Sequence, residues 1–260
     1  MIGLDTKIVV HRIPVKLKCS PMRQAFRRMK SEIILKIKEE VEKQLKAGFL
    51  IAIAYSDWVA NIVPMPKKDR KVHMYVNYKD LNRANPKDNF PLPHIDTLID
   101  NTATNRFFSF VDRFSSYNQI KMAKEDKANT AFTTHWGTYA YNAMPFGLKN
   151  VGATYQRAIV TLFHDMMHKE IEVYVDDMIA KSHIARDHLV DLRKLFKRLI
   201  KYRLRLNPNK CAFRASSRKL LGFIVNQRGI KVDPTRVQAI WDMSTPQTEK
   251  QIHSFLGKVN

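Results

Sequence analysis

Three acidic residues stand where apolar segments end, and their chemistry sets the main functional hypothesis. Asp176 and Asp177 interrupt an apolar run at residues 172–180, and Asp112 follows the apolar residues 107–111. Successive side chains of a strand point to opposite faces, so Asp176 and Asp177 can serve one ligand only from the tip of a hairpin. Asp is also common in turns, so this pair taken alone is more often structural than catalytic.

The third carboxylate, Asp112, favours the catalytic interpretation over the structural one. If the strand that ends at Asp112 pairs with the hairpin, three carboxylates meet at one sheet edge. Like charges so close are unfavourable unless divalent cations neutralise them, and hard oxygen ligands select Mg²⁺ or Mn²⁺. Two such ions activate an attacking hydroxyl and stabilise a leaving pyrophosphate. The pattern therefore indicates nucleotidyl transfer in which no side chain acts as nucleophile.

Charge and cysteine content narrow the class of protein. The 260 residues include 45 Lys and Arg and 24 Asp and Glu, which gives a net charge of +21. A polyanion is the natural partner of such a surplus, and a merely soluble basic protein is the alternative. Cys19 and Cys211 lack disulfide-framework or zinc spacing, which fits a reducing setting. With no signal peptide and no 18-residue apolar stretch, we expect an intracellular protein, cytoplasmic or nuclear, not secreted, and with no membrane partner.

The elements that must position these residues alternate irregularly, which favours an α+β fold over a doubly wound sheet. Apolar residues recur every four positions from Met29 to Leu45, which predicts a helix over residues 21–47 that stops at Gly48. The remaining predictions are a hairpin from strands 60–65 and 72–78 around the basic turn 67–71, strands at 107–111 and 131–134, a helix at 151–168, a hairpin at 173–180, a helix at 186–202, and a second hairpin at 220–232 that turns at 227–229.

Seven motifs follow one another along the chain. They are FPLPHIDTLID at 90–100, FSFVDRFSSYNQIKM at 108–122, MPFGLKN at 144–150, ATYQ at 153–156, YVDD at 174–177, LNPNKCAF at 206–213 and LLGFIVNQRGIKVDP at 220–234. In order and spacing they resemble reverse transcriptases of gypsy-type LTR retrotransposons, closest to plant elements. The resemblance implies a right-hand polymerase fold. It implies fingers with an N-terminal helix at 1–92, a palm at 93–232 with a returning fingers segment around 123–144, and a truncated start of the thumb or connection at 233–260.

The resemblance also implies the activity and its residues. The activity is RNA-directed DNA polymerisation, with an RNA or DNA template, a primer, deoxynucleotide triphosphates and two Mg²⁺ ions, or Mn²⁺, as cofactors. Asp112, Asp176 and Asp177 would be the catalytic, metal-binding triad. The residues implied at the incoming nucleotide are Lys67, His73, Arg113, Ser115, Ser116, Tyr117 and Phe146, and those at the primer end are Leu220, Leu221, Gly222 and Phe223. Tyr117 would block a ribose 2′-hydroxyl; ordinary core packing is the alternative for Tyr117 and Phe146, and a plain β-hairpin for the primer-end residues.

Several residues depart from the family pattern. His73 replaces an Arg that contacts the triphosphate, and a His is shorter and mostly neutral at pH 7. Ser116 replaces a Gly, which would strain the nucleotide pocket if that position needs a positive φ. Further unusual choices are Asn77, Lys79, Arg113 and Asn129. These departures support an alternative hypothesis, a catalytically inactive, decayed remnant that only binds nucleic acid.

Overall fold

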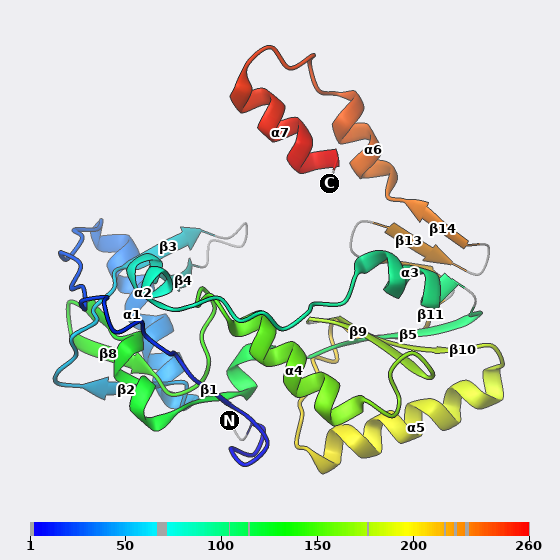
Figure 1. Cartoon of the computed structure of the whole chain (residues 1–260), viewed down its shortest axis with the longest axis horizontal. Helices are drawn as coiled ribbons and strands as arrows, with labels where there is room; N and C mark the ends of the chain where they lie inside the picture. Colours follow the sequence, from blue (N-terminus) through cyan, green and yellow to red (C-terminus); the bar gives the residue numbers. More distant parts are fainter. Residues whose placement is uncertain are drawn as a thin grey trace. The chain divides into compact units, whose positions relative to one another are not determined.

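A computed structural model describes residues 3–66, 72–103, 105–113, 115–175, 177–215, 217–220, 223–226 and 229–259. The chain divides into two compact units. Unit 1 comprises Met1–Leu92, Arg113–His164 and Phe196–Asn207, and unit 2 comprises Pro93–Asp112, Asp165–Leu195 and Pro208–Asn260. Both units mix helices and strands without regular alternation, so the predicted α+β class is confirmed (Figure 1).

Unit 1 is built from short sheets and helices. Strands β2 (Leu50–Ile53), β8 (Gly137–Tyr141) and β7 (Phe132–Thr134) form one antiparallel sheet, β3 (Ile62–Pro66) and β4 (Val72–Val76) form a hairpin, and β1 (Val10–His11) runs parallel to β6 (Lys121–Met122). The helices are α1 (Ser31–Lys46), α2 (Lys79–Ala84), α4 (Val151–Phe163) and the last residues of α5 (Ala185–Lys201). The predicted hairpin is confirmed, and its basic turn, 67–71, lies outside the described residues.

Helix α1 is shorter than the predicted helix at 21–47, because it begins only at Ser31. The segment before it is irregular and lies beside Asn61, whose side-chain amide donates to the Ala25 carbonyl at 2.7 Å. A buried asparagine therefore satisfies backbone that a helix would have to satisfy internally. The predicted stop at Gly48 is confirmed, since that residue has a φ of 75° directly after the helix.

Helix α4 ends at Phe163 rather than at the predicted His168. His168 has a left-handed φ of 64°, which ends any helical path at that point. Its backbone N–H donates to the Ile171 carbonyl at 3.0 Å, so the chain turns directly into the next strand. The apolar periodicity continues past Phe163 because Met166 is buried in that turn and not in a helix.

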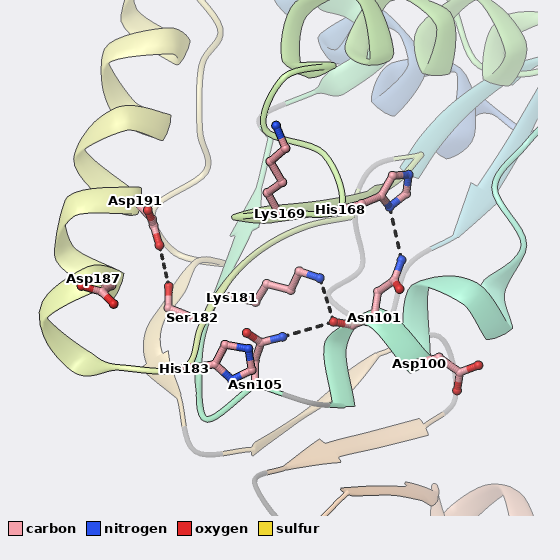
Figure 2. A pocket seen from close by; sticks show the side chains of 10 residues that line it. All are labelled: Asp100, Asn101, Asn105, His168, Lys169, Lys181, Ser182, His183, Asp187 and Asp191. Carbon is pink, nitrogen blue, oxygen red and sulfur yellow. Dashed lines mark hydrogen bonds between the residues drawn. The ribbon is translucent and has the colours of Figure 1, made fainter.

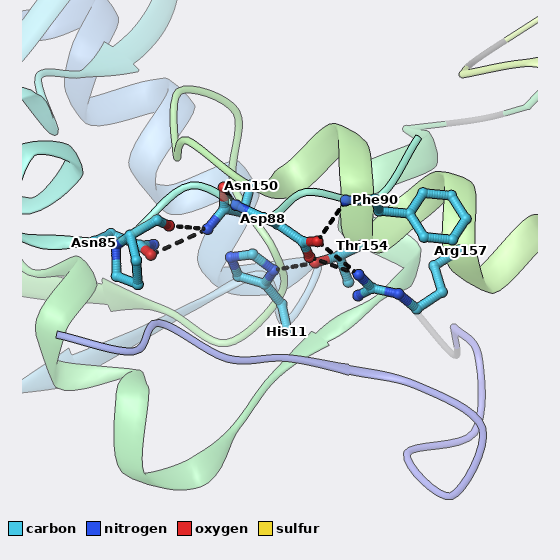
Figure 3. A network of polar contacts seen from close by, with 8 residues as sticks. His11, Asn85, Asp88, Phe90, Asn150, Thr154 and Arg157 are labelled. Carbon is cyan, nitrogen blue, oxygen red and sulfur yellow. Dashed lines mark hydrogen bonds and ion pairs between the residues drawn. The ribbon is translucent and has the colours of Figure 1, made fainter. Parts of the chain in front are cut away.

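A polar network joins β1 and α4 in unit 1 (Figure 3). Buried His11 bonds through Nδ1 to the Thr154 hydroxyl at 2.9 Å, and both Asp88 oxygens accept from Arg157 at 2.7 and 2.8 Å. Asp88 N donates to Asn150 Oδ1 at 3.0 Å. Burial lowers the pKa of His11 to about 4, because desolvation disfavours the charged ring, and the hydrogen bond from Arg157 lowers the pKa of Asp88.

Unit 2 centres on one antiparallel sheet in the order β11 (Ala212–Ala215), β5 (Phe107–Asp112), β10 (Asp177–Ser182), β9 (Ile171–Tyr174). Phe108, Phe110 and Ile179 from this sheet pack with Leu98 of α3 (Ile95–Ala103) into its core. The predicted strand at 107–111, hairpin at 173–180 and helix at 186–202 are confirmed.

Two buried polar contacts support the same sheet. Glu172 and Lys181 form an ion pair at 2.8 Å with side chains only 2% and 4% exposed. His188 of α5 bonds to Ser109 at 2.8 Å and to Ser182 at 3.1 Å, which ties the helix to two neighbouring strands. Desolvation lowers the pKa of His188, because burial disfavours the charged ring. None of these partners was predicted.

The C-terminal part of unit 2 continues with β12 (Ser217–Leu220), β13 (Phe223–Asn226), β14 (Gly229–Val232), α6 (Pro234–Trp241) and α7 (Glu249–Val259). The hairpin predicted at 220–232 is wrong at its start, because Leu220 belongs to β12 and pairs with Phe223. The element is a three-stranded meander in which Asn226 pairs with Gly229, and residues 227–228 of the predicted turn lie outside the described residues. None of the helices within the described ranges is long and apolar enough to cross a membrane.

Candidate active site

Two of the predicted triad residues meet at one end of the unit 2 sheet. In the antiparallel pairing of β10 with β5, Asp177 lies directly opposite Asp112. Directly opposite side chains have Cβ atoms about 5 Å apart, and two like charges there are destabilising by themselves. Asp112 is partly exposed and Asp177 is exposed, so both carboxylates reach solvent. The strand pairing that the three-carboxylate hypothesis requires is therefore present, while Asp176 lies outside the described residues.

The turn before Asp177 is strained. Tyr174 pairs with Asp177, and the chain begins to turn at Val175. Val175 has a left-handed φ of 47°, a value that a β-branched residue rarely adopts. Strain of this kind persists where the surrounding structure over-determines it, and it is common at functional sites.

A cation lies near one of the two carboxylates. Lys210 Nζ is 3.7 Å from Asp112 Oδ2, and the lysine side chain is mostly exposed. Lys210 belongs to the motif at 206–213, but the sequence analysis assigned it no role. A single exposed ammonium offsets little of the charge of the paired carboxylates. The donor set, oxygens only and open to solvent, fits a hard divalent cation.

The residues predicted at the incoming nucleotide gather in unit 1. His73, Ser115 and Phe146 line one cavity of about 500 Å³, within the usual range for small-ligand sites. Its other walls come from α1, from the rest of β4 and from the segment after α5. The remaining lining residues are Glu40, Lys43, Gln44, Ala47, Phe49, Met74, Tyr75, Val76, Asn118, Tyr141, Pro145 and Arg205.

The aromatic pair predicted for this pocket is in contact. The Tyr117 and Phe146 rings meet edge to face with centroids 4.7 Å apart. Tyr117 is buried and also packs against Tyr155 at 5.4 Å, whereas Phe146 is half exposed in the cavity wall. Tyr117 is thus a buried core residue, and its ring packs against the Phe146 ring, which faces the cavity.

The strain expected at Ser116 is not found, because the left-handed residue is its neighbour Ser115, with a φ of 47°. Ser116 begins a 3₁₀ turn (Ser116–Gln119) and its hydroxyl donates to the Arg113 carbonyl at 3.2 Å. A side chain is therefore accommodated where the family has a glycine. The Arg113 side chain turns into the core, with its guanidinium 4.7 Å from the Tyr155 ring centroid.

Arg205 lines the same cavity and was missed by the sequence analysis. Buried Gln119 holds its backbone at both polar atoms, accepting from Arg205 N at 2.9 Å and donating to Arg205 O at 3.1 Å. Within the described part of the chain, the structure records no ion pair or hydrogen bond of its guanidinium. Lys43, by contrast, is paired with Glu40 at 3.1 Å. The arginine is far from His73 in sequence, so no local pattern could have linked them.

Two of the predicted primer-end residues, Leu220 of β12 and Phe223 of β13, are paired with each other. Leu221 and Gly222, like Lys67 of the nucleotide set, lie outside the described residues. Their roles stay predictions.

A second cavity, in unit 2, contains none of the predicted site residues (Figure 2). It has a volume of about 370 Å³, and two of its charged side chains bind neutral groups of its own wall. Lys181 donates to the Asn101 carbonyl at 2.7 Å and Asp191 accepts from Ser182 at 2.8 Å. Over the ranges that the structure describes, no cluster of three or more His, Cys, Asp or Glu side chains has the arrangement of a metal site, here or elsewhere.

Sequence comparison identifies relatives of this chain. The family model "Reverse transcriptase (RNA-dependent DNA polymerase)" matches residues 65–225. The chain is 31% identical over 252 residues to the retrovirus-related Pol polyprotein from transposon 297 of Drosophila melanogaster, covering 95% of this chain and 23% of that protein. It is 34% identical over 184 residues to that from transposon gypsy of the same organism, covering 71% and 18%. The chain thus spans about a fifth of the length of these relatives.

Solved structures agree with the sequence relatives. The foamy viral protease-reverse transcriptase in complex with RNA/DNA hybrid matches with a TM-score of 0.85 and 25% identity, over 100% of this chain and 34% of that one. A second structure of that protein, in complex with double-stranded DNA, matches with a TM-score of 0.86 and 26% identity, over 99% and 45%. The fold is therefore the right-hand polymerase fold that the motifs predicted.

Proposed function

Because the chain belongs to the reverse transcriptase (RNA-dependent DNA polymerase) family, and to its gypsy-type retrotransposon branch, we propose that it extends a primer along an RNA or DNA template. The observation that carries this proposal is the register that sets Asp177 opposite Asp112 at an open sheet edge. A paired set of solvent-facing carboxylates has no structural use of its own, because it destabilises the sheet that carries it.

Asp112, Asp176 and Asp177 would hold two Mg²⁺ ions, or Mn²⁺. The oxygen ligands and the solvent exposure of Asp112 and Asp177 favour a hard cation over a buried ion pair. When bound, the ions would acidify the primer 3′-hydroxyl and stabilise negative charge on the phosphates. The protein's contribution is to hold its carboxylates in fixed register, with the Arg113 backbone next to Asp112 in the chain.

The unit 1 cavity would take the incoming deoxynucleotide. Ser115 and Ser116 would lie along the triphosphate, and Phe146, braced by Tyr117, would limit the room beside the sugar and so disfavour a ribose 2′-hydroxyl. Lys67 would contact the triphosphate, and Leu220 to Phe223 would hold the primer end.

Arg205 would supply the guanidinium that position 73 lacks. It lines the same cavity as His73, its backbone is fixed by Gln119, and a guanidinium binds phosphate bidentately where a neutral imidazole does not. This assignment weakens the decayed-remnant hypothesis, as does the accommodation of Ser116 without a left-handed backbone.

Primer extension on an RNA template tests the proposal. The purified chain is assayed with Mg²⁺ or Mn²⁺, with Asp176→Asn as the control. We expect extension by the wild type and none by the variant, while both bind the primer–template duplex. Salt-dependent duplex binding without any extension by the wild type would overturn the proposal in favour of the binding-only remnant.

A further inference from the structure

A short segment before β1 is anchored in the core of unit 1. Leu4 is 1% exposed, and its backbone N–H donates to the Gln119 carbonyl at 2.8 Å. Gln119 is the last residue of the 3₁₀ turn Ser116–Gln119 and is itself completely buried. A carbonyl in such a place needs a partner, because a buried backbone group without one costs free energy. The segment therefore holds the turn from the inside of the protein.

Gly3 permits the close approach of this segment to the turn. A β-carbon at Gly3 would overlap the Gln119 carbonyl oxygen and would lie 2.8 Å from the Gln119 carbonyl carbon. Both are backbone atoms, so no side-chain rotation could relieve the overlap. Glycine is the residue that lets two backbones approach this closely, and a larger residue at position 3 must push the segment and the turn apart.

The Gln119 side chain connects the same turn to the wall of the unit 1 cavity. It accepts from Arg205 N at 2.9 Å and donates to Arg205 O at 3.1 Å. Arg205 lines the cavity and lies 86 residues further along the chain. One buried side chain thus sets the place of the Arg205 backbone relative to the turn.

Two further cavity residues belong to the turn or adjoin it. Ser115 directly precedes the turn, Asn118 lies within it, and both line the cavity together with Arg205. Ser115 has a left-handed φ of 47°, a conformation that a non-glycine residue keeps only where the surrounding structure holds it. The contact of Leu4 with Gln119 supplies such support, because it fixes the buried end of the turn.

We propose that Gly3 and Gln119 are positioning residues for the incoming deoxynucleotide. The segment at Gly3 holds the turn, and the turn holds Arg205 at the cavity. The proposal rests on the proposed function in taking this cavity as the deoxynucleotide site. Neither Gly3 nor Gln119 lines the cavity, so both act through Arg205 and its neighbours. When the turn is loosened, nucleotide binding must also order the arginine, which raises KM and leaves kcat unchanged.

Steady-state primer extension at varied deoxynucleotide concentration tests the proposal on the full chain. We expect Gly3→Ala to raise KM about threefold to tenfold, the range for binding that must order one long side chain, with kcat little changed. Gly152→Ala is the matched control. It is the same change in the same unit, but the added β-carbon meets nothing within 4 Å, so KM should stay as in the wild type.

The Arg205→Ala background separates positioning from a general structural role. If Gly3 acts through Arg205, Gly3→Ala should raise KM clearly less in Arg205→Ala than in the wild type, because linked positions couple. The same factor in both backgrounds would overturn the proposal, as would a wild-type KM in Gly3→Ala.

Hydrogen exchange gives a readout that needs no catalysis. The Arg205 amide, which donates to Gln119, should exchange several-fold faster in Gly3→Ala, while the amides of β10 in unit 2 exchange as in the wild type. Unchanged exchange at Arg205 would overturn the proposal. Faster exchange at Arg205, with no primer extension by the wild type, would reject the polymerase and keep the link from Gly3 to Arg205.

The wild type alone provides a test that does not depend on Gly3→Ala folding. If the segment and the cavity wall open together, the Leu4 and Arg205 amides should show the same dependence of exchange on urea concentration. Different dependences for the two amides would overturn the proposal.

Discussion

The carboxylate edge of unit 2 and the proposed nucleotide cavity of unit 1 are held in place by different constraints. Asp112 and Asp177 sit in a continuous ladder, where a slip of one residue would turn each side chain to the other face. The cavity walls come from several separate segments, and its cations, Lys43 and Arg205, come from two of them. A carboxylate in the ladder therefore has no substitute, whereas a phosphate-binding cation lost from one wall can be replaced from another.

A substitution at the carboxylate edge should have the largest effect. Asp112→Asn preserves shape and removes one charge, so we expect duplex binding to persist and primer extension to fall on the order of ten-thousandfold, about 5 kcal/mol of transition-state stabilisation. Single-turnover extension measures the effect. Extension within about tenfold of the wild type would show that Asp112 holds no metal.

The strand that carries Asp177 also carries Lys181 of the buried ion pair, further along the same ladder. Glu172→Gln leaves the Lys181 ammonium buried without its counter-charge, and we expect a loss of about 3 to 5 kcal/mol in the free energy of unfolding. Urea denaturation gives the value. Glu125→Gln, the same change in the exposed pair with Arg12, is the control and should leave the midpoint unchanged. Equal midpoints for the two variants would show that the pair does not stabilise the sheet.

The strands and carboxylates were predictable because their signals are local. An apolar run that ends in Asp112, and a second run interrupted at Asp177, specify two strands with acids at their ends. The motif resemblance supplied the pairing and the right-hand fold. Gly48 was predicted as a helix end for the same reason, since a glycine after an apolar stripe has few other uses.

The features that were missed all depend on distant residues. The start of α1 is set by Asn61, and the position of Arg205 by Gln119, and neither partner is near in sequence. The meander at β12 was missed because Leu220 has the same apolar character in a preceding strand as in a hairpin. The left-handed backbone fell on Ser115 instead of Ser116, a one-residue difference that composition does not report.

The polar network of unit 1 should make stability depend on pH. Folded His11 has a pKa of about 4 against an ordinary value of 6.5, so between these values the unfolded chain binds the proton and the folded chain does not. The free energy of unfolding therefore falls as the pH drops from 6.5 towards 4, by up to about 1.4 kcal/mol per pH unit from His11. His188, whose pKa is also lowered, adds in the same direction.

Denaturation of His11→Asn across that pH range checks this expectation. The variant should show a shallower pH dependence, while His183→Gln, a change at an exposed histidine, should follow the wild type. Parallel curves for the wild type and His11→Asn would mean that His11 is not the titrating group.

The smallest expected effect tests whether one cationic side chain of the cavity can take the place of another. Arg205→Ala should raise KM for the deoxynucleotide about tenfold, with kcat little changed, because a charged hydrogen bond contributes about 1.5 to 3 kcal/mol and the wall is partly exposed. Arg205→Lys should recover part of the loss. Arg83→Ala, a change at an exposed arginine of α2 that does not line the cavity, is the control.

A double-mutant cycle tests whether Arg205 replaces the guanidinium missing at position 73 or only lines the same cavity. His73→Arg restores a guanidinium at the position where the family carries one, and we expect it to lower KM for the deoxynucleotide. If the two side chains serve the same phosphates, Arg205→Ala should cost several-fold less in the His73→Arg background than in the wild type, since contacting positions couple. Strictly additive effects would show that Arg205 and His73 act on separate groups. Arg205 would then not replace the guanidinium missing at position 73, and the cavity would not differ from the carboxylate edge in this respect.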